Sequence, residues 1–159
     1  MTDAEIAALI EETKTLPADY LQRLKQKTKR GHREAEVELP GTRGSVFRVI
    51  IRESSENPLD FSVILAHKPP NTNVWFRLRR YNGKSHEHTN RLEGSKFFDF
   101  HIHTATERYQ DSGFREDAFA EPTARYSDVN GALECLISDC GFEIERGNQK
   151  SLFEEGKDQ

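Results

Sequence analysis

Residues 86–103 read HEHTNRLEGSKFFDFHIH and hold four of the six histidines of the chain, as two His-x-His pairs. Side chains on a β-strand alternate between its two faces. His86 and His88 therefore share one face of a first strand, and His101 and His103 share one face of a second. The stretch predicts two strands that each present a pair of imidazoles.

A Gly-Ser dipeptide at 94–95 lies midway between the pairs, and this combination suits a two-residue type II′ turn. The turn predicts a hairpin in which His88 lies opposite His101 and His86 lies opposite His103. All four imidazoles then share one face, with cross-strand Cβ atoms about 5 Å apart.

The other face of this predicted hairpin carries Phe98, Phe100 and Ile102, which would seat it on an apolar core. The pairing depends on the length of the turn, because a longer turn through Leu92–Lys96 shifts the register. A slip of one residue places the two histidine pairs on opposite faces.

The segments before the hairpin predict an antiparallel sheet. Period-two alternation over residues 35–39 is typical of a half-exposed strand, which Pro40-Gly41 then ends. Further strands are predicted from their β-branched and aromatic residues at Ser45–Arg52, Phe61–His67 and Val74–Tyr81.

The last of these strands predicts a face that is both cationic and aromatic. Alternation places three apolar side chains on one face of the strand. The other face then carries Trp75, Arg77, Arg79 and Tyr81.

Helical patterns flank the predicted strands on both sides. Thr2 and Glu5 form a capping-box pattern at the start of a first helix, and a second helical stretch continues as far as Gly31. Ser127 is the predicted N-cap of a C-terminal helix that ends at Gly141, with apolar residues at i, i+3, i+4 and i+7.

This order of elements predicts an α+β fold with an antiparallel, curved β-sheet of five to seven strands, N-terminal helices and one C-terminal helix packed on the sheet. A single domain is expected over residues 1–144, followed by a flexible polar tail at 145–159. Within the domain we expect a helical part at 3–30, the sheet at 33–110 and the C-terminal helix at 127–141. The connection Thr104–Tyr126 has no clear period, and connections of this length are usually functional.

The composition is that of a soluble globular protein, with 159 residues of which 35% are hydrophobic and 31% charged. No apolar run approaches the roughly 20 residues that span a bilayer, and the N-terminus lacks a signal-peptide pattern. We therefore expect no membrane contact and a cytoplasmic location. Cys135 and Cys140 are too far apart on a predicted helix to form a disulfide.

The formal net charge is −4, but the charges are unevenly distributed along the chain. Basic residues gather at 23–33 and at 77–91, whereas acids predominate after residue 107. This distribution is compatible with local contact to a polyanion. The alternative interpretation of the basic stretch 25–30 is a solvated helix face.

The histidine face predicts acid–base chemistry on RNA. Two histidines of opposite protonation can deprotonate a 2′-hydroxyl and protonate the leaving oxygen, and clustering separates their pKa values. The predicted catalytic residues are His86, His88, His101 and His103. The predicted nucleic-acid contacts are Arg77, Arg79, Arg80 and Lys84 for phosphates, with Trp75 and Tyr81 for base stacking.

Other interpretations of the same residues remain open. The four histidines are also candidate ligands for a divalent transition metal. His86-x-His88 followed by Glu93 matches the spacing of the first cupin motif, although the second cupin motif is absent. Alternatively, the chain is a protein-binding module without catalysis, whose contact surface is residues 104–126 and the acidic C-terminal third. The histidines would then belong to an exposed polar sheet face and bond to Asn90, Asp99 or water.

The segments Arg80-Tyr81-Asn82-Gly83 and His86-Glu87-His88, followed by a phenylalanine-bearing strand and a terminal helix with leucines, resemble the core of the TumE-type toxins of bacterial toxin–antitoxin pairs. The resemblance covers residues 61–142. The chain departs from that pattern by lacking an aspartate after Tyr81, by having glycine at position 83, and by its N-terminal extension.

The segments HEHTN and FHIHTATERY also resemble small bacterial proteins of unassigned function. The resemblance to TumE-type toxins implies an intracellular growth-inhibitory protein that a cognate antitoxin neutralises. The leading prediction is therefore a toxin-like or defence-associated protein that acts on RNA by ribonuclease-like phosphodiester cleavage.

Overall fold

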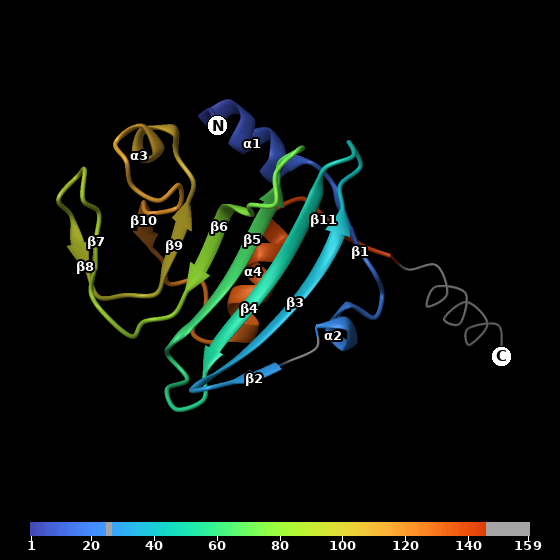
Figure 1. The fold of residues 1–159 in the computed structure, drawn as a ribbon. Coiled ribbons are helices and arrows are strands. Elements are labelled where there is room, and N and C mark those ends of the chain that lie inside the picture. Colours follow the sequence, from blue (N-terminus) through green and yellow to red (C-terminus); the bar gives the residue numbers. More distant parts are fainter. Residues whose placement is uncertain (25–26, 146–159) are drawn as a thin grey trace.

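Four long strands form the centre of the fold and pair antiparallel in chain order (Figure 1). The computed structural model describes residues 1–24 and 27–145. The strands are β3 (His32–Pro40), β4 (Val46–Ser54), β5 (Phe61–Lys68) and β6 (Phe76–Asn82). Their alternating or β-branched residues suit a pleated surface, and the predicted strands in this region are confirmed.

Three short strands extend the sheet on both sides of this centre. On one side, β2 (Lys27–Lys29) pairs with β3; on the other, β9 (His101–Thr104) pairs with β6 and β10 (Ala120–Pro122) pairs with β9. The order over the described residues is β10-β9-β6-β5-β4-β3-β2, with different strands at the two edges. The predicted α+β class and strand number are therefore confirmed, and the sheet is open.

One face of the sheet is covered by α4 (Val129–Asp139), which Figure 1 shows behind β4, β5 and β6. Ala132, Leu133 and Leu136 of this helix are buried. The predicted C-terminal helix is confirmed, but its N-cap is Asp128, whose side chain accepts a hydrogen bond from the Gly131 nitrogen at 2.8 Å. We call the opposite side of the sheet the open face.

The N-terminal helix α1 (Asp3–Glu11) begins with the predicted capping box, in which Thr2 and Glu5 each accept a backbone hydrogen bond from the other residue. It is followed by β1 (Lys14–Leu16), which pairs in parallel with β11 (Phe142–Ile144). Neither strand was predicted from the sequence, because neither is longer than three residues.

Lys14 is fully buried at this junction. Its ammonium group lies 2.7–2.9 Å from the backbone oxygens of Leu9, Ile10, Glu12 and Cys140. These oxygens lie at the C-terminal ends of α1 and α4, where helix carbonyls lack intrahelical partners. Lys14 therefore joins the ends of the two helices.

The predicted second helix is wrong beyond Arg23, because α2 spans only Tyr20–Arg23 and the chain returns as β2. β2 pairs with β3 and is an edge strand of the seven-stranded sheet. Residues 25–26 of the predicted basic stretch lie outside the described residues.

The connection between β9 and α4 contains a short helix, α3 (Glu107–Asp111), and the edge strand β10. Thr106 caps α3 by accepting a hydrogen bond from the Tyr109 nitrogen at 3.2 Å. Tyr109 is fully buried and anchors the connection. The segment predicted to be functional thus supplies a strand to the sheet.

Neither Cys135 nor Cys140 forms a disulfide, as expected. Among the described residues, no helix has the length and apolar character needed to cross a membrane. Of the predicted polar tail, residues 146–159 lie outside the described residues.

Candidate metal centre

The histidine-rich stretch forms a hairpin, but not the predicted one. β7 (His88–Thr89) pairs with β8 (Lys96–Phe97), and His88 lies opposite Phe97. The hairpin loop is longer than two residues, because the Asn90 nitrogen donates to the Ser95 oxygen at 2.9 Å. The predicted pairing of His88 with His101, and of His86 with His103, is therefore wrong.

The second histidine pair lies on β9, which joins the main sheet instead of the hairpin. Asn82 and Arg80 of β6 lie opposite His101 and His103, respectively. Ile102 lies opposite the buried Tyr81, which belongs to the core. The prediction that His101 and His103 share a face away from Ile102 is confirmed, and this face is the open face.

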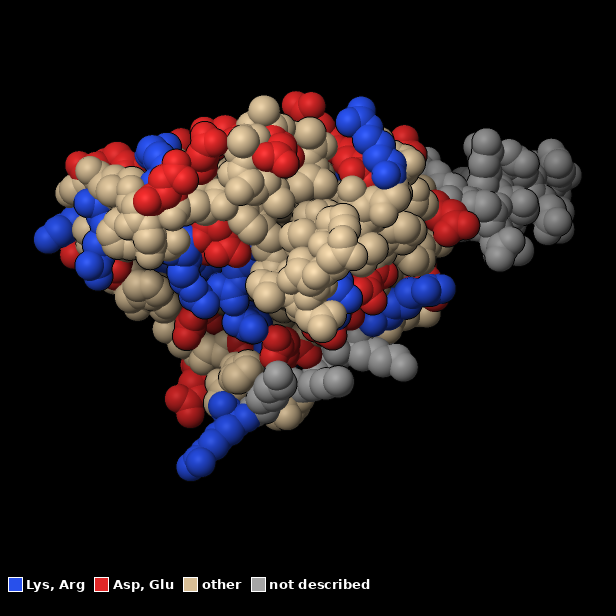
Figure 2. All heavy atoms as spheres, turned by 45° about the horizontal axis from the view of Figure 1, so that its top comes forward, with Lys and Arg blue, Asp and Glu red and all other residues tan. Residues whose placement is uncertain are grey.

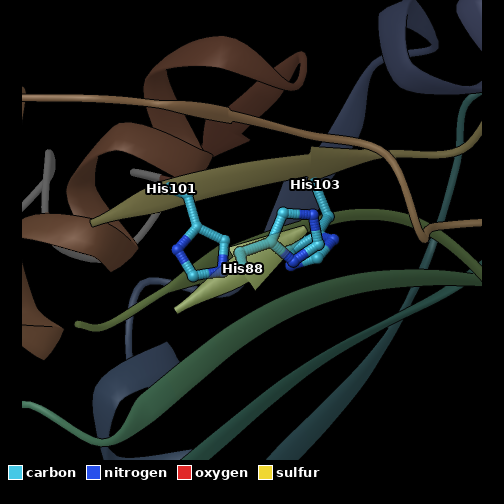
Figure 3. A group of neighbouring side chains, drawn as sticks. All are labelled: His88, His101 and His103. Atoms are coloured by element: carbon cyan, nitrogen blue, oxygen red, sulfur yellow. The ribbon is translucent and has the colours of Figure 1, made fainter. Parts of the chain in front are cut away.

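Asn90 attaches the hairpin to the edge of the sheet. Its amide nitrogen donates to the Ala120 oxygen at 2.8 Å, and its amide oxygen accepts from the Ala120 nitrogen at 2.9 Å. The side chain thus pairs with the backbone of β10 as a neighbouring strand would. This attachment places His88 beside His101 and His103 (Figure 3).

The three imidazoles form one compact group. Ring centroids lie 5.2 Å apart for His88 and His101, and 4.9 Å apart for His103 with each of the other two. One nitrogen from each ring lies within 4.8 Å of the other two nitrogens. Ligand nitrogens bind zinc at about 2.0–2.1 Å, so small side-chain shifts would bring all three onto one ion.

Hydrogen bonds to the backbone select the tautomers of the two buried histidines. Nδ1 of His101 donates to the Asp99 oxygen at 2.8 Å, and Nδ1 of His103 donates to the Asp117 oxygen at 2.7 Å. A carbonyl oxygen can only accept, so the proton of each neutral ring is on Nδ1. The lone pair is therefore on Nε2, the arrangement found when a backbone carbonyl orients a metal-binding histidine.

The tautomer of His88 follows from Asn90. The Ala120 bonds fix which amide atom of Asn90 is oxygen, and this oxygen lies 2.8 Å from Nε2 of His88. Nε2 must then be the donor, which leaves the lone pair of His88 on Nδ1. Each of the three rings thus has one unprotonated nitrogen, as a metal ligand requires.

Burial keeps these imidazoles uncharged. It lowers the pKa of His101 to about 4 and that of His103 to about 2. Burial also lowers the pKa of His88, although the bond to Asn90 opposes this shift. Three neutral rings in one place are the form in which histidine binds metals.

His86 does not join this group. It is exposed, its Nδ1 lies 3.2 Å from the Ser85 hydroxyl, and its ring centroid lies 6.4 Å from that of His101. The structure therefore brings together three of the four predicted histidines.

The cupin-like role suggested for Glu93 is not supported by its position. Its carboxylate accepts hydrogen bonds from Arg108 at 2.8 Å and from the Tyr109 hydroxyl at 3.0 Å. Among the described residues, the candidate ligand group contains histidines alone.

The predicted cationic and aromatic face is divided between the two sides of the sheet. The register between β5 and β6 shifts so that Leu65 lies opposite Arg79, whereas Ala66 lies opposite Arg77. Leu78 is the extra residue of this bulge, and it moves Arg77 and Arg79 onto different faces. The prediction that they share a face is therefore wrong.

The remaining predicted contacts lie in several places. Tyr81 is buried on the helix side, where its hydroxyl donates to Asp139 at 2.6 Å. Arg80 lies on the open face beside His103. The guanidinium carbon of Arg48 lies 4.1 Å from the centre of the Trp75 ring. The ammonium nitrogen of Lys84 lies 5.9 Å from the centre of the Phe98 ring.

Asn90 was expected as a partner of the histidines in the polar-face interpretation, and in the structure it binds His88 at 2.8 Å. Asp117 is a residue of the site that was not predicted. Asp117 is fully buried and accepts a hydrogen bond from Nε of Arg80 at 2.9 Å. No local pattern marks Asp117, because its partners come from other strands.

Comparisons with protein-family models, with curated proteins and with solved structures found no match. The resemblance to TumE-type toxins therefore stays a prediction from the sequence.

Proposed function

We propose that this protein binds one divalent transition metal ion through His88, His101 and His103 and uses it for hydrolytic chemistry. The observation that carries the proposal is the grouping of three histidines, each with one ring nitrogen within 4.8 Å of those of the other two and each with a hydrogen bond that leaves one ring nitrogen unprotonated. Nitrogen ligands without carboxylates favour zinc, cobalt, nickel or copper over magnesium and calcium.

Three protein ligands leave one tetrahedral position for water or substrate. A zinc ion held by His88, His101 and His103 would lower the pKa of a water molecule in this position to about 7 and so would activate it as a nucleophile near neutral pH. Because His86 stands outside the group, it does not occupy this position. The site therefore has the composition of a catalytic zinc centre.

Acid–base cleavage of RNA has less support from the same geometry. That reaction needs one protonated and one neutral histidine, whereas burial favours the neutral form of both His101 and His103. Arg79 and Tyr81, two of the predicted RNA contacts, lie on the helix side of the sheet. RNA cleavage, an antitoxin partner and a protein-binding role stay predictions from the sequence.

The test is a measurement of metal content after reconstitution with zinc. We expect about one zinc ion per wild-type chain, and a loss of binding by at least about 10–100-fold in His88→Ala, His101→Ala and His103→Ala, since even indirect partners of a metal cost that much. Replacing zinc with cobalt should give the absorption spectrum of a tetrahedral site.

The matched control is His86→Ala, because it removes a neighbouring histidine that lies outside the group. It should keep the metal. His88 is only half-buried, so His88→Ala is the variant least prone to unfold, and circular dichroism verifies its fold. Absence of metal from the wild type, or equal metal in His88→Ala and wild type, contradicts the proposal.

A further inference from the structure

Arg77 presents a half-buried cation on the open face. Among the described residues, its guanidinium has no hydrogen bond or ion pair, and only its backbone nitrogen is engaged, with Glu116 at 3.1 Å. Burial lowers the pKa of Arg77, and the nearby Arg115, Arg80 and Arg52 lower it further, whereas Asp117 raises it. A partly desolvated charge without a partner is costly, so the position favours an anionic ligand.

Arg80 extends this cationic region toward the candidate metal centre. It lies opposite His103 on the neighbouring strand, which places their Cβ atoms about 5 Å apart. Its Nε is bound to Asp117, but its two terminal amino groups have no protein partner within the described residues. Arg80 therefore has donors available for a ligand beside the three histidines.

Arg77 and Arg80 follow one another along the same face of β6. Ala66 and Ile64, which lie opposite them on β5, are two residues apart on one face of that strand. His103, Arg80 and Arg77 thus form a short row that begins at the metal centre. A ligand anchored on the two arginines can reach the metal with its other end.

The row would carry a net positive charge once a metal is bound. The three histidine ligands are neutral, so the ion would keep its two positive charges, while the carboxylates of Asp117 and Glu116 offset the charges of the two arginines. Nearby positive charges attract an anion and orient it. Paired donors of an arginine match the two oxygens of a carboxylate or phosphate.

The extent of the basic region favours a small ligand over a nucleic acid. Figure 2 shows basic and acidic side chains interspersed on the face that it draws, with a compact basic group bordered by acidic residues. Nucleic-acid binding depends on neutralising several phosphates along a strand. Arg77 and Arg80, flanked by Glu116 and Asp117, supply two guanidinium groups instead of such a series, and two groups suffice for a single acid group.

We propose that the metal centre acts on a small anionic substrate, whose carboxylate or phosphate group is held by Arg77 and Arg80 while its reacting group reaches the metal. The reaction rests on the proposed function, because it requires the metal. The binding of the acid group does not, because the two arginines belong to the protein alone.

The test measures anion binding by calorimetry, first on metal-free protein and then on zinc-loaded protein. Methyl phosphate and acetate are the probes, and their relative affinities distinguish a phosphate from a carboxylate substrate. We expect Arg77→Met and Arg80→Met each to weaken binding of the preferred probe at least tenfold while zinc content is unchanged. Arg43→Met is the control, because Arg43 is an exposed arginine of the β3–β4 turn, and it should bind like the wild type.

The outcomes separate the two proposals. Arginine-dependent anion binding without any zinc uptake supports the anion site and removes the metal centre. If the protein binds zinc but binds no anion, the anion site alone is overturned. The same holds if it binds zinc and neither arginine variant changes its affinity for the anion. Binding of single-stranded RNA that needs both arginines and that neither probe displaces also overturns it. Arg77→Lys keeps the positive charge and should therefore retain part of the affinity for the anion. This variant distinguishes loss of the charge from a folding defect.

Discussion

Asn90 holds the candidate site together through both halves of its amide. It pairs with both backbone groups of Ala120, and it also orients His88. The ring of His88 would otherwise be free to choose either tautomer. A single buried amide thus determines which nitrogen of His88 is available to a metal.

Removing this amide should damage stability and metal binding together. In Asn90→Ala the backbone groups of Ala120 lose their partners in a buried place, so we expect the free energy of unfolding of the metal-free protein to fall by about 1–3 kcal/mol. Zinc affinity should fall by about 10–100-fold, as it does when a residue that orients a ligand is lost. Urea denaturation and zinc titration measure the two effects.

The comparison for this variant is Asn73→Ala, which removes an exposed asparagine and should change neither quantity. A zinc affinity of Asn90→Ala equal to that of the wild type would show that Asn90 does not orient His88.

At the scale of single elements, the C-terminal end of α4 is fixed by Asp139. Both oxygens of this carboxylate accept hydrogen bonds from Arg125 at 2.8 Å, and the Tyr81 hydroxyl donates to one of them. The bonds from Arg125, followed by that from Tyr81, lower the pKa of Asp139, although burial opposes them. The ion pair therefore favours the folded state wherever the carboxylate is charged.

This ion pair predicts a dependence of stability on pH. A carboxyl whose pKa is lower in the folded state stabilises the protein above its unfolded pKa, and the effect disappears as the pH falls through the folded value. Arg125→Met should lower the free energy of unfolding by about 1 kcal/mol at pH 6, a modest figure because Arg125 is half-exposed. The difference from wild type should shrink as the pH falls below 3.8, the ordinary value for Asp139.

Urea denaturation at several pH values measures this difference. The control is Arg43→Met, which removes an exposed arginine that forms no ion pair with Asp139 within the described residues, and it should track the wild type throughout. A difference for Arg125→Met that stays constant down to the lowest pH would exclude Asp139 as its source.

Elements whose signal is local were predictable from the sequence. β3 alternates between buried and exposed residues, and α4 has apolar residues at helical spacing. In both cases the sequence of the element itself shows which face is buried. The bulge in β6 has no such signal, because Leu78 is an ordinary strand residue and the register with β5 determines the irregularity. Arg77 and Arg79 could not be assigned to opposite faces without that register.

The candidate site was predictable in part for the same reason. Strand alternation correctly placed His101 and His103 on one face. The proximity of His88 to His101 and His103 depends on which strand pairs with β9. It also depends on the contact of Asn90 with Ala120, thirty residues away. The assumed two-residue turn gave β9 the wrong partner strand, and of the four histidines that it grouped, His86 does not join the other three.

At the scale of the whole molecule, a metal would connect two sheets that otherwise share few bonds. His88 belongs to the hairpin of β7 and β8, whereas His101 and His103 belong to the seven-stranded sheet. A ligand that binds only the folded state stabilises it by about 2.7 kcal/mol at a free concentration of 100 times its dissociation constant. Metal binding and docking of the hairpin should therefore be linked.

We expect zinc to raise the midpoint of thermal unfolding of the wild-type protein in proportion to the logarithm of its free concentration. Hydrogen exchange of the hairpin amides should slow at the same time, because opening of the hairpin would break a metal bond. His88→Ala should show neither change. A shift of the same size in this variant would place the stabilising ion elsewhere.

The parallel pair of β1 and β11 has a consequence for biosynthesis. A ribosome releases the N-terminal segment long before residues 142–144, which are the partner of β1, and before Cys140, whose carbonyl binds Lys14. The apolar side chains Ile6, Ile10 and Leu16 have no completed core until then. Residues 6–16 therefore cannot complete their packing until residues 140–144 have been synthesised, and this is the period in which chaperones would recognise them.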